Sequence, residues 1–147
     1  MTEPQGPPRV LTVAVVAWAI GAMALIALGL IGFTSGSDLR QAYLDQGMSS
    51  DSANSYVSFV RTLSVVLALL GLVIAALLGA VRDGGRVARR IVVGVSGLFA
   101  AVSFVSLAAG AVPVPPLIVV ALIVLLVVAS VLSYRPAAGA WFARART

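Results

Sequence analysis

Four long stretches without a charged side chain constrain this sequence more than any other feature. They cover residues 10–33, 62–81, 91–110 and 117–134. An apolar helix of about 20 residues, rising 1.5 Å per residue, crosses the hydrocarbon core of a bilayer. Each stretch can therefore form a transmembrane helix in which every peptide group is paired internally. The sequence predicts an all-α fold, a transmembrane four-helix up-down bundle with a short helical extracytoplasmic segment between the first two spans.

The composition agrees with residence in a membrane and removes several kinds of chemistry. Hydrophobic residues make up 61% of the 147 residues and charged residues 10%, whereas about a quarter of the residues in a soluble domain are charged. The sequence contains no Cys and no His. A thiol nucleophile, a disulfide and a Cys-type zinc site are thereby excluded, and the commonest general base and metal ligand is missing.

The basic residues, all of them arginines, are distributed unequally between the two sides of the predicted membrane. Arg40 and Arg61 lie in the connection between the first and second spans. The other arginines lie on the opposite side: Arg9, Arg82, Arg86, Arg89, Arg90, Arg135, Arg144 and Arg146. Because loops rich in Arg are retained in the cytoplasm, we expect both termini there (N-in/C-in) and place this multi-pass protein in the cell membrane.

These positions divide the chain into segments. We expect a disordered cytoplasmic tail at residues 1–9, a transmembrane domain at residues 10–135 and a cytoplasmic interfacial tail at residues 136–147. Within the transmembrane domain, residues 34–61 are the expected extracytoplasmic loop and residues 82–90 the expected cytoplasmic loop.

The extracytoplasmic loop carries signals for two short helices. Ser37 can cap the first helix and Gly47 can terminate it. Ser49 or Ser50 can cap the second, which leads into the second span through a helical stripe: Ala53, Tyr56, Val57 and Val60. We interpret this loop as a cap on the outer end of the bundle or, alternatively, as a surface that docks a partner.

Small residues recur along the second span and predict a helix-packing face: Ala68, Gly71, Ala75 and Gly79. Lipid supplies no hydrophobic drive between helices, so close backbone approach at small residues has to hold a membrane bundle together. The alternative is that small residues are simply common in this chain. Trp18, well inside the first span, is expected to pack between helices.

The predicted cytoplasmic loop holds a basic run that either binds anionic headgroups or only fixes the topology: Arg82, Arg86, Arg89 and Arg90. Arginines near a membrane surface are attracted to anionic lipid. Trp141 and Phe142, flanked by arginines, are typical of an interfacial anchor. Because this positive charge lies beside membrane spans, we expect lipids and not nucleic acid as its partners.

The predicted spans contain no Asp, Glu, Lys, Arg, His, Asn or Gln, although membrane enzymes and pumps hold ionisable groups inside the bilayer. No catalytic, cofactor or metal site is expected. The leading hypothesis is a non-enzymatic accessory or scaffold subunit that packs against other membrane proteins or forms a homo-oligomer. The alternative is a small transporter or channel for an apolar or lipidic substrate, with an opening lined by Ser96, Ser103 and Ser106.

Two short motifs carry a resemblance. The first is a G-R-x-A-R loop containing Gly85, Arg86, Ala88 and Arg89, and the second is an R-P-x4-W-F tail formed by Arg135, Pro136, Trp141 and Phe142. With the order of the spans, they make the chain similar to a family of small four-span membrane proteins of actinobacteria. The loop departs from that family at Val87, where its members often carry an aromatic residue. The resemblance implies a membrane architecture and no particular activity.

Overall fold

The computed structural model describes residues 6–108 and 115–144, and these residues form six helices and no strand. The helices are α1 (Arg9–Thr34), α2 (Gly36–Asp45), α3 (Ser50–Arg82), α4 (Arg86–Ala108), α5 (Pro116–Ser133) and α6 (Pro136–Arg144). The prediction of an all-α chain is confirmed. The greater part of the tail expected at residues 1–9 and the end of the span expected at residues 91–110 lie outside the described residues.

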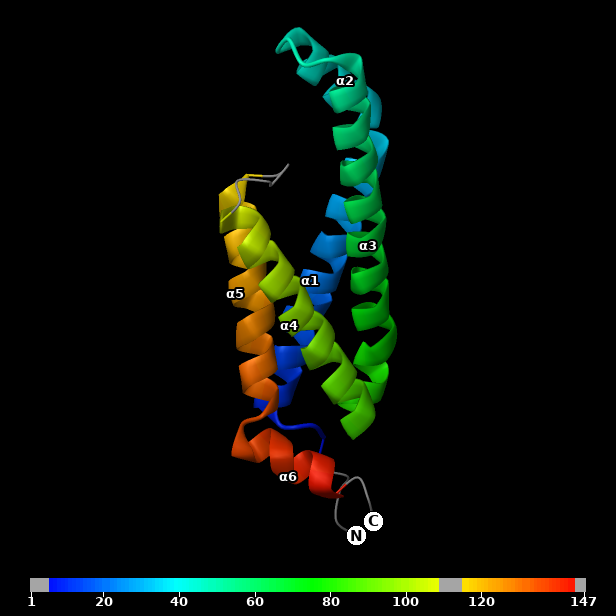
Figure 1. Cartoon of the computed structure of the whole chain (residues 1–147). Coiled ribbons are helices and arrows are strands. Elements are labelled where there is room, and N and C mark those ends of the chain that lie inside the picture. The colour runs from blue at the N-terminus through cyan, green and yellow to red at the C-terminus, as the bar shows by residue number, and fades with distance from the viewer. Residues whose placement is uncertain (1–5, 109–114, 145–147) are drawn as a thin grey trace.

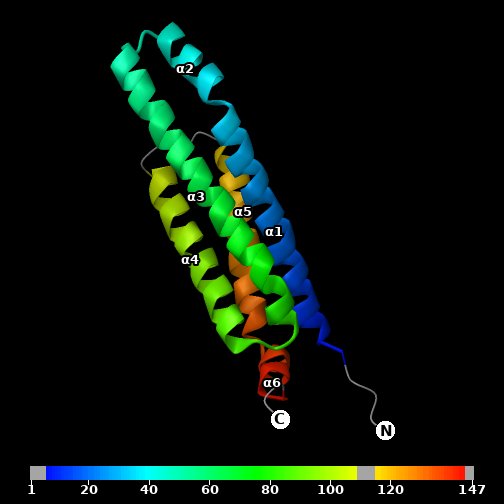
Figure 2. The same ribbon diagram turned by 90° about the vertical axis from the view of Figure 1, so that its right-hand side faces the viewer.

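Four of these helices, α1, α3, α4 and α5, are long and apolar enough to cross a membrane. They form a ring in which α1 contacts α3 and α5, and α4 contacts the same two helices (Figures 1 and 2). The centre of the ring is filled by apolar side chains from all four helices, including Trp18, Ile74, Val92 and Leu126. Trp18 has no exposed surface, which confirms that it packs between helices.

The two ends of the bundle differ. At one end, the α6 end, α6 lies across the bundle beside the start of α1 and the turn between α3 and α4 (Figure 1). At the other end, the α2 end, α2 packs on α3 and projects beyond α4 and α5 (Figure 1). The projection follows from length, since the 33 residues of α3 extend for about 50 Å at 1.5 Å per residue.

The second short helix expected at the α2 end does not exist as a separate element. It is the first part of α3, because no Gly or Pro interrupts the chain between Ser50 and Gly71. The stripe that begins with Ala53, Val57 and Val60 is buried and continues directly into the apolar part of the helix.

Two of the three helix caps predicted at this end are found in the structure, and the third is not. Ser49 caps α3 by accepting a hydrogen bond from the Ser52 backbone N–H at 3.3 Å. Gly47 ends α2 with a φ of 83°. Ser37 does not cap α2: this helix begins at Gly36, separated from α1 only by Ser35, whose hydroxyl donates to the Ile31 carbonyl at 2.8 Å. The short junction places Ser37 inside the first turn instead of before it.

Candidate functional site

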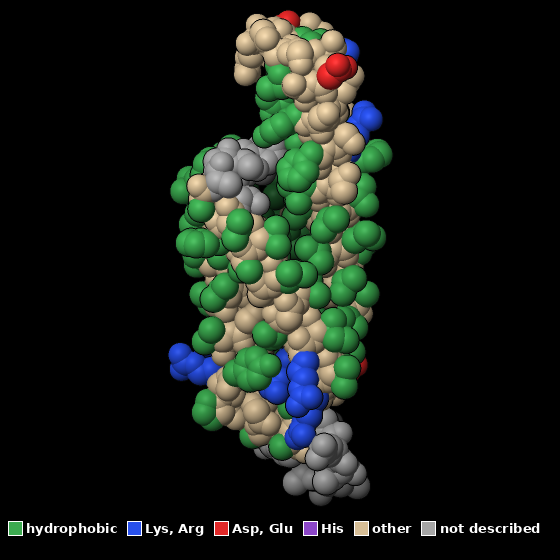
Figure 3. Space-filling model, viewed as in Figure 1, with side chains coloured by type: hydrophobic (Ala, Val, Ile, Leu, Met, Phe, Trp, Pro, Cys, Tyr) green, Lys and Arg blue, Asp and Glu red, His purple; other side chains and the backbone are tan. Residues whose placement is uncertain are grey.

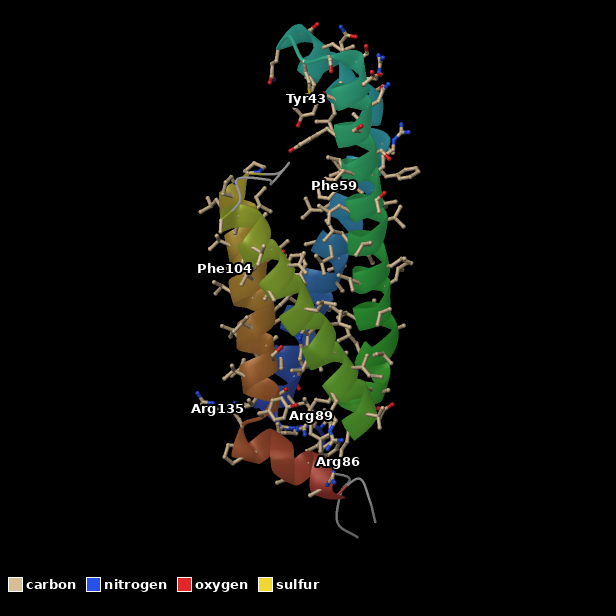
Figure 4. All side chains as sticks on the ribbon, viewed as in Figure 1. Tyr43, Phe59, Arg86, Arg89, Phe104 and Arg135 are labelled. Carbon is tan, nitrogen blue, oxygen red and sulfur yellow. The ribbon has the colours of Figure 1, made fainter. Side chains whose placement is uncertain are left out.

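The α6 helix is held against the bundle by its own pattern of side chains. Pro136, which has no N–H to leave unpaired, stands at the first position of the helix. Ala138 and Phe142, four residues apart, share the face that turns toward the bundle, and both are buried. Figure 4 shows Arg86 and Arg89 at this end, between α4 and the ribbon of α6.

Arg89 is the centre of this contact. Its guanidinium carbon lies 4.5 Å from the centroid of the Tyr134 ring and 4.4 Å from that of Phe142. Its Nη1 donates a hydrogen bond to the Ser133 carbonyl at 3.2 Å. That carbonyl belongs to the last residue of α5, where the helix dipole places partial negative charge. Arg89 therefore links the start of α4 to the end of α5 and to α6.

Two further hydrogen bonds join the same elements. Arg86 Nε donates to the Phe142 carbonyl at 3.0 Å. Trp141 Nε1 donates a hydrogen bond, 3.2 Å long, to the carbonyl of Arg82, which is the last residue of α3. Side chains near the α3–α4 turn thus hold α6 in place, and α6 in turn holds that turn.

The structure brings together residues that the sequence treated as two groups, the basic loop and the aromatic tail. Arg82 and Arg90 are exposed, whereas Arg86 and Arg89 are half-buried. Trp141 is half-buried and Phe142 is buried. Tyr134, which completes the stack, escaped the sequence reasoning, although an aromatic residue at the end of an apolar span is a signal of an interfacial position.

The small residues of the second span lie in two different environments. Gly71 is buried against α1: a Cβ atom there would lie 2.7 Å from the Ala22 carbonyl oxygen. Ala68 faces Gly29 of α1, where a Cβ atom would lie 2.8 Å from the Ala68 backbone nitrogen. Ala75 and Gly79, in contrast, are exposed. The close approach of α1 and α3 therefore uses the half of this stripe that lies nearer the α2 end.

Two glycines of α1 that lie against α3 were missed. Gly29 faces Ala68, and a Cβ atom at Gly32 would collide with the Ser64 hydroxyl. The available signal was the spacing of Gly29, Gly32 and Gly36 at intervals of three and four residues, which is the same small-residue pattern.

A second set of small residues lies on the exposed surface of α4. Gly94, Gly97 and Ala101 recur at intervals of three and four along α4 and are exposed. Apart from adjacent residues and the backbone of the same helix, no heavy atom lies within 4 Å of the position that a Cβ would take at Gly79, Gly94 or Gly97. Packing within a single chain therefore does not require glycine at these three positions.

The serines expected to line a lateral opening are placed differently. Ser96 and Ser103 are buried in the bundle, and the side chain of Ser106 lies outside the described residues. An apolar cavity of about 190 Å³ occurs instead between α1 and α3, toward the α2 end, with Leu28, Gly32, Val60 and Leu67 in its lining.

The described residues contain no cluster of three or more His, Cys, Asp or Glu side chains that could hold a metal ion. At the α2 end the rings of Tyr43 and Tyr56 meet edge to face with centroids 4.7 Å apart. Burial and the neighbouring Tyr56 raise the pKa of the Tyr43 phenol.

Comparison of the chain with protein-family models, with curated proteins and with solved structures found no match.

Proposed function

We propose that this protein is a non-enzymatic accessory or scaffold subunit that acts by packing its helices against other membrane proteins or against a second copy of itself. Support for a membrane location comes from the four long apolar helices and from their exposed apolar surface (Figure 3). The observation that carries the packing role is the outward face of α4 formed by Gly94, Gly97 and Ala101, which we name the small-residue face.

The small-residue face suits a partner helix for a physical reason. In lipid, helices associate by van der Waals contact and weak polar contacts, and these require close backbone approach. Glycine also costs an exposed helix position about 1 kcal/mol relative to alanine. Two such residues on an outward face of α4, with no neighbour of their own, are well explained by a helix from another chain.

Crosslinking in native membranes, followed by mass spectrometry, tests this role. The wild-type chain is expected to give crosslinked products with a defined partner or with itself, and Gly97→Leu is expected to abolish them. Because Gly97 has open space beside it, the leucine leaves the fold of the monomer intact. Ala121→Leu, an enlargement that is smaller by one carbon atom on the exposed side of α5, is the control and should keep the products. Recovery of a lone monomer with several crosslinkers contradicts the proposal.

We also propose that the spans alternate in direction, with the α6 end in the cytoplasm of a cell whose plasma membrane holds the protein. The arginines gathered at the α6 end support this orientation. The absence of Cys from the sequence allows single-cysteine labelling in intact cells. An impermeant maleimide should modify Gln46→Cys, whereas Asp83→Cys should react only after the membrane is opened. The reverse pattern would invert the orientation.

A transporter of an apolar or lipidic substrate is the second candidate. It is favoured by the apolar cavity between α1 and α3, which includes Leu28 and Leu67 in its lining. Purified protein in liposomes should then move a fluorescent lipid between leaflets, and Leu67→Trp, which fills the cavity, should stop the movement. Equal rates for empty liposomes and for liposomes with the wild-type protein would eliminate this candidate.

A further inference from the structure

Three arginines share one face of the first turn of α4. Arg86, Arg89 and Arg90 stand at i, i+3 and i+4, a spacing that places their side chains together on a helix surface. Arg86 and Arg89 are half-buried, and Arg90 is exposed. Figure 3 shows blue side chains gathered at this end of the molecule, directly below a surface that is mainly hydrophobic. We name these three residues the arginine face.

The hydrogen bonds within the protein leave most of the donors on this face unpaired, although one of these, Arg89 Nε, is buried. A guanidinium carries five N–H groups. Arg86 gives one to the Phe142 carbonyl and Arg89 one to the Ser133 carbonyl. Both acceptors are neutral backbone groups, so these bonds orient the guanidinium groups without neutralising them.

Most acidic residues of the described chain belong to the opposite end of the bundle from the arginine face. Among the described residues, Asp38, Asp45 and Asp51 belong to the α2 end, and Asp83, exposed in the α3–α4 turn, is the acidic residue of the α6 end. A half-buried positive charge is poorly solvated and gains from an anion that can enter the site. The arginine face is therefore suited to an anion from outside the chain.

The position of the face selects the kind of anion. It stands at the end of an apolar span, where phospholipid headgroups lie. Phosphate oxygens match the fork of a guanidinium, which can bind them through two parallel hydrogen bonds. Val87 and Ile91, which adjoin these arginines along α4, and Val131, near the end of α5, are exposed apolar residues that can receive acyl chains. A free phosphate ion would use none of that surface.

We infer that the arginine face binds the phosphate group of an anionic phospholipid, with the acyl chains along the exposed apolar residues of α4 and α5. Because Arg86 and Arg89 also contact α6, the bound lipid draws their guanidinium groups into one network with α6. Lipid binding therefore slows the transient detachment of α6 from the bundle.

Native mass spectrometry of the full chain, released from mixed micelles of phosphatidylglycerol and phosphatidylcholine, tests the inference. The wild-type protein should retain phosphatidylglycerol in preference to phosphatidylcholine. Arg90→Gln should lower that preference about fivefold, the effect of one arginine near the membrane surface. Arg90→Lys, which keeps the charge and loses the fork, should have an intermediate effect. Arg61→Gln, which removes an exposed arginine near the α2 end, should have none.

A second measurement separates a lipid site from a site for free phosphate. Amide hydrogen exchange in residues 136–144 should slow when phosphatidylglycerol is added and should not change with millimolar inorganic phosphate. Equal retention of the two lipids by the wild-type chain would overturn the inference. The same holds for equal losses with Arg90→Gln and Arg61→Gln, or for displacement of phosphatidylglycerol by inorganic phosphate.

Discussion

The guanidinium of Arg89, at the start of α4, stacks on the ring of Phe142, near the end of α6, at 4.4 Å from the ring centroid. The contact joins the first turn of α4, next to the α3–α4 connection, to α6. It gives a half-buried arginine a role in fastening α6, in addition to any part that its charge has in orienting the protein.

Loss of this stack should release α6 without unfolding the four long helices. Each cation–π contact contributes about 0.5–2 kcal/mol, and Arg89 makes two. Arg89→Gln is therefore expected to speed amide hydrogen exchange in residues 136–144 by about tenfold or more, since a factor of ten corresponds to about 1.4 kcal/mol. Exchange in α1 and α3 should not change. In detergent without anionic lipid, Arg90→Gln, beside it on the same helix, serves as the control, and equal acceleration in both variants would contradict the role of the stack.

Gly71 and Gly79 should respond oppositely to alanine. A methyl group at Gly71 would lie 2.7 Å from the Ala22 carbonyl oxygen and 2.8 Å from Ile26 Cγ1, so Gly71→Ala should destabilise the protein by about 1–3 kcal/mol through overpacking. At Gly79 the space is open, and Gly79→Ala should stabilise the helix by up to about 1 kcal/mol. Thermal unfolding in detergent measures both. Equal shifts of the two midpoints would show that α3 does not face α1 through Gly71.

Gly32 and Ser64 form a pair that a double substitution can test. A methyl group at Gly32 would collide with the Ser64 hydroxyl, which donates a hydrogen bond to the Val60 carbonyl at 2.7 Å. Gly32→Ala should destabilise the protein by about 1–3 kcal/mol. Removing the hydroxyl opens the space, because the Ser64 Cβ would lie 3.4 Å from the new methyl group.

The double variant Gly32→Ala with Ser64→Ala should thus recover most of the stability lost in Gly32→Ala alone. Unfolding midpoints of the wild-type protein, both single variants and the double variant give the coupling free energy. Strict additivity of the two single effects would indicate that the residues do not touch.

The turn between α3 and α4 should depend on Gly84. Its φ of 90° lies in the left-handed region, where a side chain costs about 1–2 kcal/mol. Gly84→Ala is expected to lower the free energy of unfolding by that amount. Gly139→Ala in α6, where nothing lies within 4 Å of the new methyl group, is the matched control and should not destabilise. Unfolding of both variants in the same detergent checks the difference.

Local features of the fold could be predicted because their causes lie within a few residues. Hydropathy over about 20 residues locates an apolar helix wherever it packs, and α1, α3, α4 and α5 were found this way. The cap at Ser49 and the left-handed Gly47 follow from short-range hydrogen bonding and backbone sterics. The junction at Ser35 was misplaced by two residues because α1 continues almost directly into α2, and the boundary between two adjoining helices has a weak local signal.

The rotation of each helix about its axis was decided only by the tertiary structure. Lipid and protein interior are equally apolar, so a uniformly apolar helix carries no hydrophobic face that distinguishes one from the other. For that reason the sequence could not separate Gly71, which packs on α1, from Gly79, which is exposed. The stack of Arg89 between Tyr134 and Phe142 was hidden likewise, because it joins segments far apart in the chain. By itself, the sequence determined four apolar helices and the clustering of arginines around their ends, and the packing determined which of those residues hold one another.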